Sequence, residues 1–185
     1  MKLDKLYLKY ENEIIERFFS QIIERFKSEK KAFYVDKNLN VKEDEILELG
    51  NINYPSGYIN VYRRFDNPEK WDVTFLELKN AVKLTLRSGG ILGSGDYNKM
   101  TGTSNFVGTP LRTLIALVPD NEYKKFSLAG QTITHPKFGA VKVNSVDFKN
   151  DFILIEVENE VKKIKMDFWE IDEKEFKRVI DESPA

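Results

Sequence analysis

Four short segments of β-forming residues follow one another closely between residues 131 and 168. Two tight polar turns, Lys149–Asp151 and Asn159–Glu160, separate the last three of them. A stretch this short cannot build two packed sheets, and closing the strands into a small barrel is the simplest way to remove exposed sheet edges. We therefore expect a small β-barrel in this part of the chain. The four segments are Gln131–Thr134, Val141–Phe148, Phe152–Glu158 and Val161–Met166.

The same stretch carries a recognisable pattern. Residues 133–139 read Ile-Thr-His-Pro-Lys-Phe-Gly, and the apolar strands 141–143, 153–157 and 161–164 follow. This pattern resembles the Tudor-like barrel at the C-terminus of bacterial superfamily 1 DNA-repair helicases. The resemblance implies a binding module that contacts partner proteins such as RNA polymerase, and it implies no chemistry. His135, Lys137 and Phe138 are the candidate partner-binding residues on it; alternatively, His135 and Phe138 shape the turn and fill the barrel.

The remainder of the chain predicts mixed helices and strands. Apolar residues at helical spacing indicate one long helix over residues 3–28. A capping box of Thr74 and Glu77 begins a helix over 74–87, and glycines follow its end. Residues 32–35 and 58–65 are typical of strands, and a C-terminal helix begins at the cap Asp172.

Two segments leave the choice between helix and strand open, namely 41–49 and 111–118. Before the second, Thr109 and Pro110 suit a helix N-cap followed by the first helical position. The fold class predicted is therefore α+β. We expect a mixed domain over residues 1–125, followed at 126–185 by the small Tudor-like barrel with its terminal helix.

Residues 88–109 form a segment rich in Gly, Ser, Thr and Asn. Loops of this length are usually functional or disordered, so a partner- or ligand-contacting loop and a mobile or hairpin connection are both open. A phosphate site is a third possibility, because glycines let backbone N–H groups approach an anion, but the Walker and dinucleotide motifs are absent. The candidate partner-binding residues here are Tyr97, Asn98, Lys99, Thr103, Ser104 and Asn105.

Two further groups of residues suit nucleic acid. Asp66 or Asp72, followed by Glu77 and Lys79, matches the Asp…Glu-x-Lys spacing of metal-dependent nucleases, which place two carboxylates on one Mg²⁺. If residues 73–79 are helical, however, Glu77 and Lys79 point apart and cannot share a metal. The second group combines tyrosines with the candidate nucleic-acid-binding residues Arg63, Arg64 and Arg87, for which solvated strand positions are the ordinary explanation.

Composition excludes several classes of function. The 29 basic and 30 acidic residues nearly cancel, so the net charge of −1 exerts no global attraction on nucleic acid or an anionic membrane. With no cysteine and one histidine, thiolate and multi-histidine metal sites are excluded, and we expect neither a metal nor a cofactor. No apolar run is long enough for a membrane span, and the N-terminus lacks a signal-peptide pattern, so a cytoplasmic protein without a membrane partner is expected.

These observations favour a non-enzymatic binding protein. It would engage a protein or nucleoprotein partner as an accessory or inhibitory factor of a bacterial mobile element or phage, for example in anti-defence. A metal-dependent enzyme acting on nucleic acid or a nucleotide, and a protein that binds nucleic acid directly, are the alternatives.

Overall fold

The computed structural model describes residues 1–36, 38–64, 69–101 and 107–181. The chain divides into two compact units. The β5–β8 unit comprises Met1–Ile15, Lys83–Gly90 and Asp120–Ala185, and the β1–β4 unit comprises Glu16–Val82 and Ile91–Pro119. Helices α1 (Leu3–Glu29) and α2 (Phe75–Ser88) each have one part in either unit. The sequence-based expectation divides the chain into two continuous segments at residue 125, and this division stays a prediction.

Helix α1 has the apolar stripe that its sequence predicts. Tyr7, Phe18, Ile22 and Phe26 recur at helical spacing along it and are buried. The helix is closed by Lys30, whose φ of 58° places it in the left-handed region and whose N–H donates to the carbonyl of Phe26 at 2.8 Å. The helix expected over 3–28 is therefore confirmed. No helix in the described ranges combines the length and the apolar character needed to cross a bilayer.

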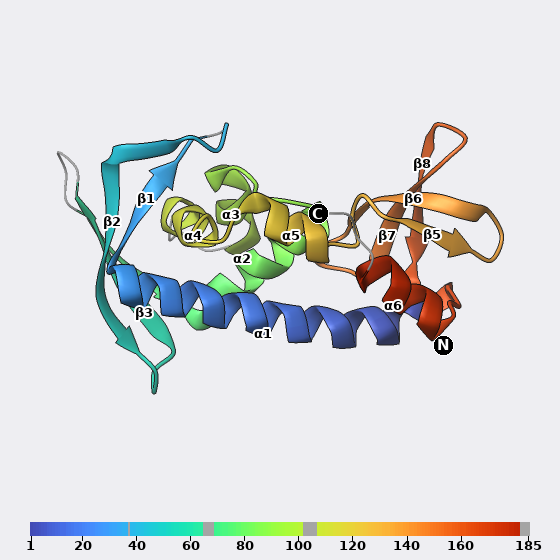
Figure 1. The fold of residues 1–185 in the computed structure, drawn as a ribbon, viewed down its shortest axis with the longest axis horizontal. Coiled ribbons are helices and arrows are strands. Elements are labelled where there is room, and N and C mark those ends of the chain that lie inside the picture. Colours follow the sequence, from blue (N-terminus) through green and yellow to red (C-terminus); the bar gives the residue numbers. More distant parts are fainter. Residues whose placement is uncertain (37, 65–68, 102–106, 182–185) are drawn as a thin grey trace. The chain divides into compact units, whose positions relative to one another are not determined.

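The β1–β4 unit contains a four-stranded antiparallel sheet in sequential order (Figure 1). Residues 41–49, ambiguous in sequence, belong to a strand because they pair with neighbours on both sides. Two ladders of backbone hydrogen bonds outweigh the helix-capping signal that Asn40 and Glu43 give at the start of that segment. The fourth strand was not expected. The strands are β1 (Lys31–Val35), β2 (Val41–Asn53), β3 (Tyr58–Arg64) and β4 (Glu69–Thr74).

Helices cover one face of this sheet. Figure 1 places α3 (Ser94–Thr101) and α4 (Gly108–Ile115) on the same side of the strands. Arg112 holds α4 in place because its Nε donates to the carbonyl of Leu92 at 2.7 Å and its Nη2 to that of Asp36 at 2.6 Å. The buried residues on the covered face of the sheet are Ala32, Leu47, Ile59, Val61 and Val73.

Part of the segment expected as a loop over residues 88–109 is the helix α3, so that expectation is wrong there. The Thr109 cap is also wrong, because α4 begins at Gly108 and its N-cap is Val107. The reason is tertiary. Tyr97 is fully buried, and burial of a large aromatic side chain outweighs the weak helix propensity of the Gly, Ser and Asn residues around it.

The β5–β8 unit contains a second four-stranded antiparallel sheet, again in sequential order. All four strands expected from the sequence are present. In the described residues β5 and β8 are the two end strands and do not pair with each other, so strand pairing does not close this sheet into the expected barrel. The strands are β5 (Thr132–His135), β6 (Gly139–Val146), β7 (Phe152–Val157) and β8 (Glu160–Lys165).

After β8 the chain returns to β5 through a 3₁₀ turn, η1 (Met166–Phe168). The indole of Trp169, which is fully buried, donates from Nε1 to the carbonyl of Thr134 in β5 at 3.0 Å. Beside it, Glu170 forms an antiparallel bridge with Lys2. The unit also contains α5 (Asp120–Phe126) and α6 (Glu173–Asp181), and the cap Asp172 accepts backbone N–H bonds at the start of α6, as expected.

Candidate interaction surface

The predicted site residues of helix α3 have structural roles. Tyr97 is buried, and its hydroxyl oxygen accepts the N–H of Leu92 at 3.3 Å. The side-chain oxygen of Asn98 accepts the N–H of Gly108 at 2.6 Å and so caps the start of α4. Tyr97 is therefore inaccessible to a partner, whereas Asn98 is half-buried and Lys99 is exposed, and partner binding by these two stays a prediction. Thr103, Ser104 and Asn105 lie outside the described residues.

His135 organises the turn between β5 and β6. Its Nδ1 accepts the backbone N–H of Lys137 at 3.0 Å and that of Phe138 at 3.3 Å. Its ring stacks on Phe138, with centroids 4.8 Å apart, and meets the edge of Trp169 at 4.5 Å. Burial, and then the charge of Lys137, lower the pKa of His135 below its usual value. The imidazole therefore acts as a neutral acceptor that shapes the turn.

Arg87, a predicted nucleic-acid contact, is inaccessible. Its side chain is 1% exposed and forms two parallel hydrogen bonds with the Glu11 carboxylate, Nε to Oε1 at 2.7 Å and Nη2 to Oε2 at 2.8 Å. The hydroxyl of Tyr7 donates to the same carboxylate at 3.1 Å, and burial followed by the charge of Glu11 raises the pKa of Tyr7 well above its usual value. Arg87 thus belongs to a buried ion pair. Arg63 is partly buried, and the side chain of Arg64 lies outside the described part of the structure.

The nuclease-like spacing is divided between unrelated local roles. Glu77 and Thr74 form the expected capping box, since the Thr74 N–H donates to Glu77 at 2.8 Å and the Glu77 N–H donates to the Thr74 hydroxyl at 3.0 Å. Lys79 pairs with Glu16 at 2.6 Å, and Asp72 accepts a hydrogen bond from the Asn60 amide. Asp66 lies outside the described residues, among which no group of three His, Asp or Glu side chains could hold a metal. The helical reading of residues 75–79 is confirmed.

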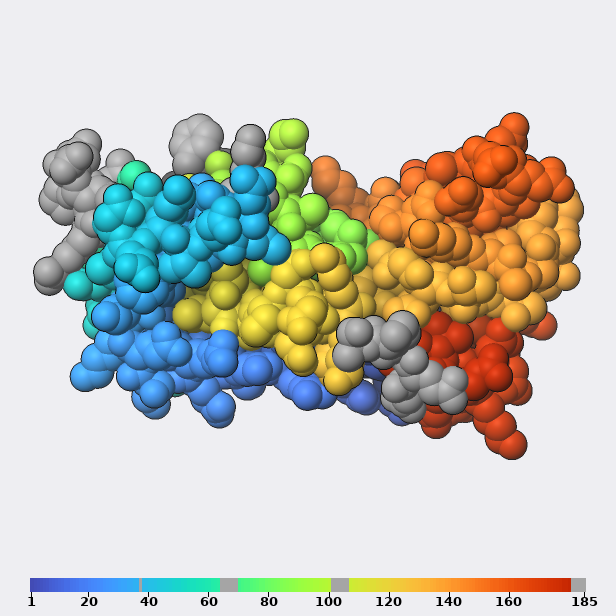
Figure 2. Space-filling model, turned by 45° about the horizontal axis from the view of Figure 1, so that its top comes forward, coloured from blue at the N-terminus to red at the C-terminus, as the bar shows by residue number. Residues whose placement is uncertain are grey.

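A basic and aromatic surface lies on the outer face of the β7–β8 hairpin. We call it the β8 surface. Figure 2 shows the hairpin, in orange-red, open on the face that is drawn. Phe152 pairs with Lys165 and Leu154 with Lys163 across the two strands, which places these side chains on one face of the sheet. The β8 surface consists of Phe152, Val161, Lys163, Lys165 and Phe168.

The lysines of the β8 surface lie over aromatic rings. The ammonium of Lys163 is 4.4 Å from the ring centroid of Phe152, and that of Lys165 is 5.7 Å from Phe152 and 6.0 Å from Phe168. In the described residues no carboxylate lies within 4.0 Å of either ammonium. Phe168 is 76% exposed and Val161 is 59% exposed. Of these five residues, sequence reasoning points only to Lys163, which with Lys162 forms a basic pair that could contact phosphate or lie on a solvated strand face. The alternation of Val161, Lys163 and Lys165 is the readable signal of a strand with an exposed face.

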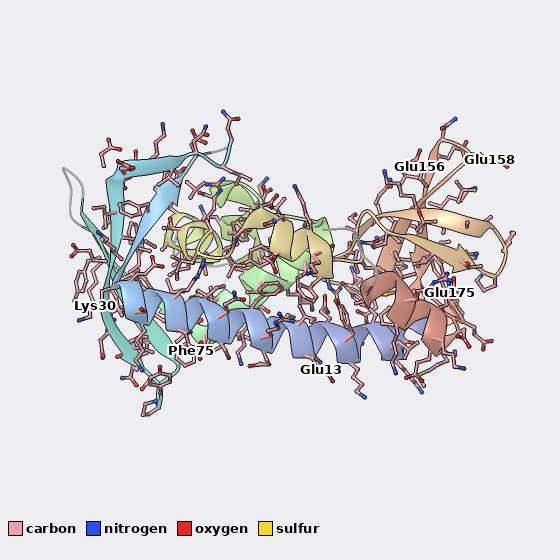
Figure 3. The ribbon with its side chains drawn as sticks, in the orientation of Figure 1. Glu13, Lys30, Phe75, Glu156, Glu158 and Glu175 are labelled. Carbon is pink, nitrogen blue, oxygen red and sulfur yellow. The ribbon has the colours of Figure 1, made fainter. Side chains whose placement is uncertain are left out.

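The two end strands of this sheet have different edges. On β5, the outward backbone groups of Thr134 are both occupied, since its N–H donates to Glu175 at 3.1 Å and its carbonyl accepts the indole N–H of Trp169. Figure 3 labels Glu175 on α6. On β8, pairing in the described residues is with β7 alone. One edge is therefore covered by side chains of the same unit, and the other is open as far as the described residues are concerned.

Comparisons of the chain with protein-family models, curated proteins and solved structures gave no match.

Proposed function

We propose that the chain is a non-enzymatic binding protein and that the β8 surface contacts its partner, a protein or nucleoprotein. The observation that carries this proposal is the exposed Phe168 beside Lys165, on a surface where neither Lys163 nor Lys165 has a carboxylate within ion-pairing distance in the described residues. A large apolar ring in water costs free energy that a partner recovers by covering it. A lysine ammonium that lies over a ring face can still bind an anionic group on its side away from the ring.

The location of this surface supports the same proposal. It lies on the sheet whose sequence resembles a Tudor-like binding module. Of the residues first expected to bind, His135 stacks on Phe138 and also meets the ring of Trp169. The binding role would therefore belong to the β8 side of the module. A protein that acts by occupying a partner in this way suits an accessory or inhibitory factor of a bacterial mobile element or phage.

Capture from bacterial lysate with three tagged variants tests the proposal. The wild-type chain is expected to retain a partner that Phe168→Ser combined with Lys165→Glu loses. Leu76→Ser is the matched control, because Leu76 is 68% exposed on α2, away from β8 in the sequence and in the other unit. Equal recovery of every protein by the wild type and the Phe168/Lys165 variant would remove the β8 surface from the binding role.

Direct binding of single-stranded nucleic acid is the second candidate, and the same residues favour it. Exposed rings beside lysines are the elements with which proteins stack bases and neutralise phosphates. This candidate predicts binding to oligo(dT) that weakens steeply as salt rises, with a slope set by the number of lysine–phosphate contacts. A salt-independent or undetectable affinity for oligo(dT) contradicts it.

A further inference from the structure

The backbone of β8 presents a regular set of outward groups. The N–H of Met166 donates to the carbonyl of Asp151 at 2.9 Å, so residues 151 and 166 face each other across the hairpin as a hydrogen-bonded pair. In an antiparallel ladder such pairs alternate with residues whose N–H and C=O point away from the partner strand. Given the register of β7 and β8, the outward residues are Val161, Lys163 and Lys165.

In the described residues, the outward backbone groups of Thr134 on β5, unlike those of β8, are bound by side chains of the same unit. The N–H of Val143 donates to the carbonyl of Gln131, which makes Thr134 an outward residue of β5. Its N–H and carbonyl are taken by Glu175 and Trp169. Exposed edges are usually blocked in ways like this, because they pair readily with other strands. The described residues give β8 no comparable cover.

We propose that β8 is a docking edge, to which an extended acidic segment of a partner protein adds as a further strand. This inference rests on the proposed function and specifies its partner chemistry. Outward N–H and C=O groups at every second residue match another polypeptide backbone, whereas nucleic acid has no such repeat. The three residues that carry the outward groups are also members of the β8 surface, and their side chains are exposed.

Charge specifies the incoming segment. Lys163 and Lys165 stand on the outer face, so carboxylates at alternate positions of an added strand would lie beside them. Lys162 points to the opposite face and is already 3.8 Å from Glu160. Glu156 lies on the outer face too, between Lys142 of β6 and Val161 of β8 in the register of the sheet. Figure 3 labels Glu156 and Glu158 toward the tip of the hairpin. The acidic residues of the partner segment would therefore lie toward the base of the hairpin, away from these two carboxylates.

The test uses the full chain and a labelled peptide, Ac-Glu-Val-Glu-Val-Glu-Val-Glu-amide, whose alternation places every carboxylate on one face. Fluorescence anisotropy should detect binding by the wild type. Lys163→Glu with Lys165→Glu should weaken the affinity by about tenfold or more, since two attractive pairs become repulsive. The same peptide with lysine in place of glutamate should not bind.

Val161→Pro separates backbone pairing from charge. Proline at this position removes an outward N–H, leaves the ladder with β7 intact and keeps every charge. It should weaken peptide binding by about threefold to tenfold, the loss of one hydrogen bond, while Val161→Ala should change it by less than about twofold. Far-UV circular dichroism reports whether the proline variant is folded. If it is not, the wild type is tested with a peptide N-methylated at alternate residues, which should bind no better than the lysine peptide.

The outcomes separate this inference from the proposed function. Equal binding by Val161→Pro and Val161→Ala, or by the methylated and unmethylated peptides, overturns strand addition. If in addition the Phe168/Lys165 variant still loses its partner in lysate, the proposed function stands without it. Binding of oligo(dT) with no affinity for the acidic peptide overturns the inference in favour of nucleic acid.

Discussion

The buried pair of Arg87 and Glu11 supports a quantitative prediction about stability. Replacing Arg87 by methionine leaves the Glu11 carboxylate, 2% exposed, with the Tyr7 hydroxyl as its remaining hydrogen-bond donor among the described residues. Breaking a buried ion pair by removing one partner costs about 3–5 kcal/mol. Arg87 also donates to the carbonyls of Asp147 and Asn150 in the β6–β7 turn, and the loss of these bonds adds to the effect.

The double variant separates the charge from the packing. With both Glu11 and Arg87 replaced by methionine, no charge is stranded, and apolar pairs of similar volume are often as stable as the ion pair. The turn carbonyls still lose their donor, at about 1 kcal/mol for each bond. We expect the double variant to be about 1–2 kcal/mol less stable than the wild type, which gives a coupling of about 2 kcal/mol or more between the two sites.

Urea denaturation followed by circular dichroism measures each free energy of unfolding, and an unchanged m-value validates the comparison. The prediction is refuted if Arg87→Met lowers the free energy of unfolding by less than about 1 kcal/mol, because an unpaired carboxylate buried away from water costs more than that. It is also refuted if the losses of Arg87→Met and Glu11→Met, each measured alone, add up to the loss of the double variant, because the two sites would then be energetically independent.

Three further predictions concern single positions. Gly108→Ala should destabilise the chain by about 1–3 kcal/mol in urea denaturation, because a Cβ there overlaps the carbonyl of Ser94 and the Asn98 amide, whereas Gly95→Ala, with open space around it, should be neutral or stabilising. Thr74→Ala should cost about 1 kcal/mol by removing the capping box; no loss would contradict the cap. His135 has a lowered folded pKa, so its stabilising contribution is present above its unfolded value of about 6.5 and is lost as pH falls through the folded pKa. The stability difference between the wild type and His135→Asn should therefore shrink on acidification, and an NMR midpoint at or above 6.5 would disprove the assignment.

Arg87 illustrates why the sequence misleads about sites. It stands in the last turn of α2 beside Gly89, where a basic residue ordinarily faces solvent and the helix dipole. Its burial depends on Glu11, which lies 76 residues away, and on the turn after β6. No local pattern encodes such a meeting of distant segments, so an arginine that looks like a nucleic-acid contact is a core residue.

Local physical chemistry was readable from the sequence. The periodicity of α1, the capping box of α2, the Asp172 cap of α6 and the four short strands β5 to β8 follow from rules that act over a few residues. The α+β class follows from these elements together. The helix α3 could not be predicted from such local rules, because its stability comes from burial of Tyr97 and not from the helix propensities of its residues.

The tertiary structure alone decided which edge of the second sheet is open. Thr134 and Lys163 are both outward residues of end strands, and nothing in their neighbouring residues distinguishes them. Glu175 and Trp169, which close the first edge, come from 41 and 35 residues further along the chain. Strand character is local because it arises from the pleat and its side chains, whereas the availability of an edge depends on which distant segments return to cover it.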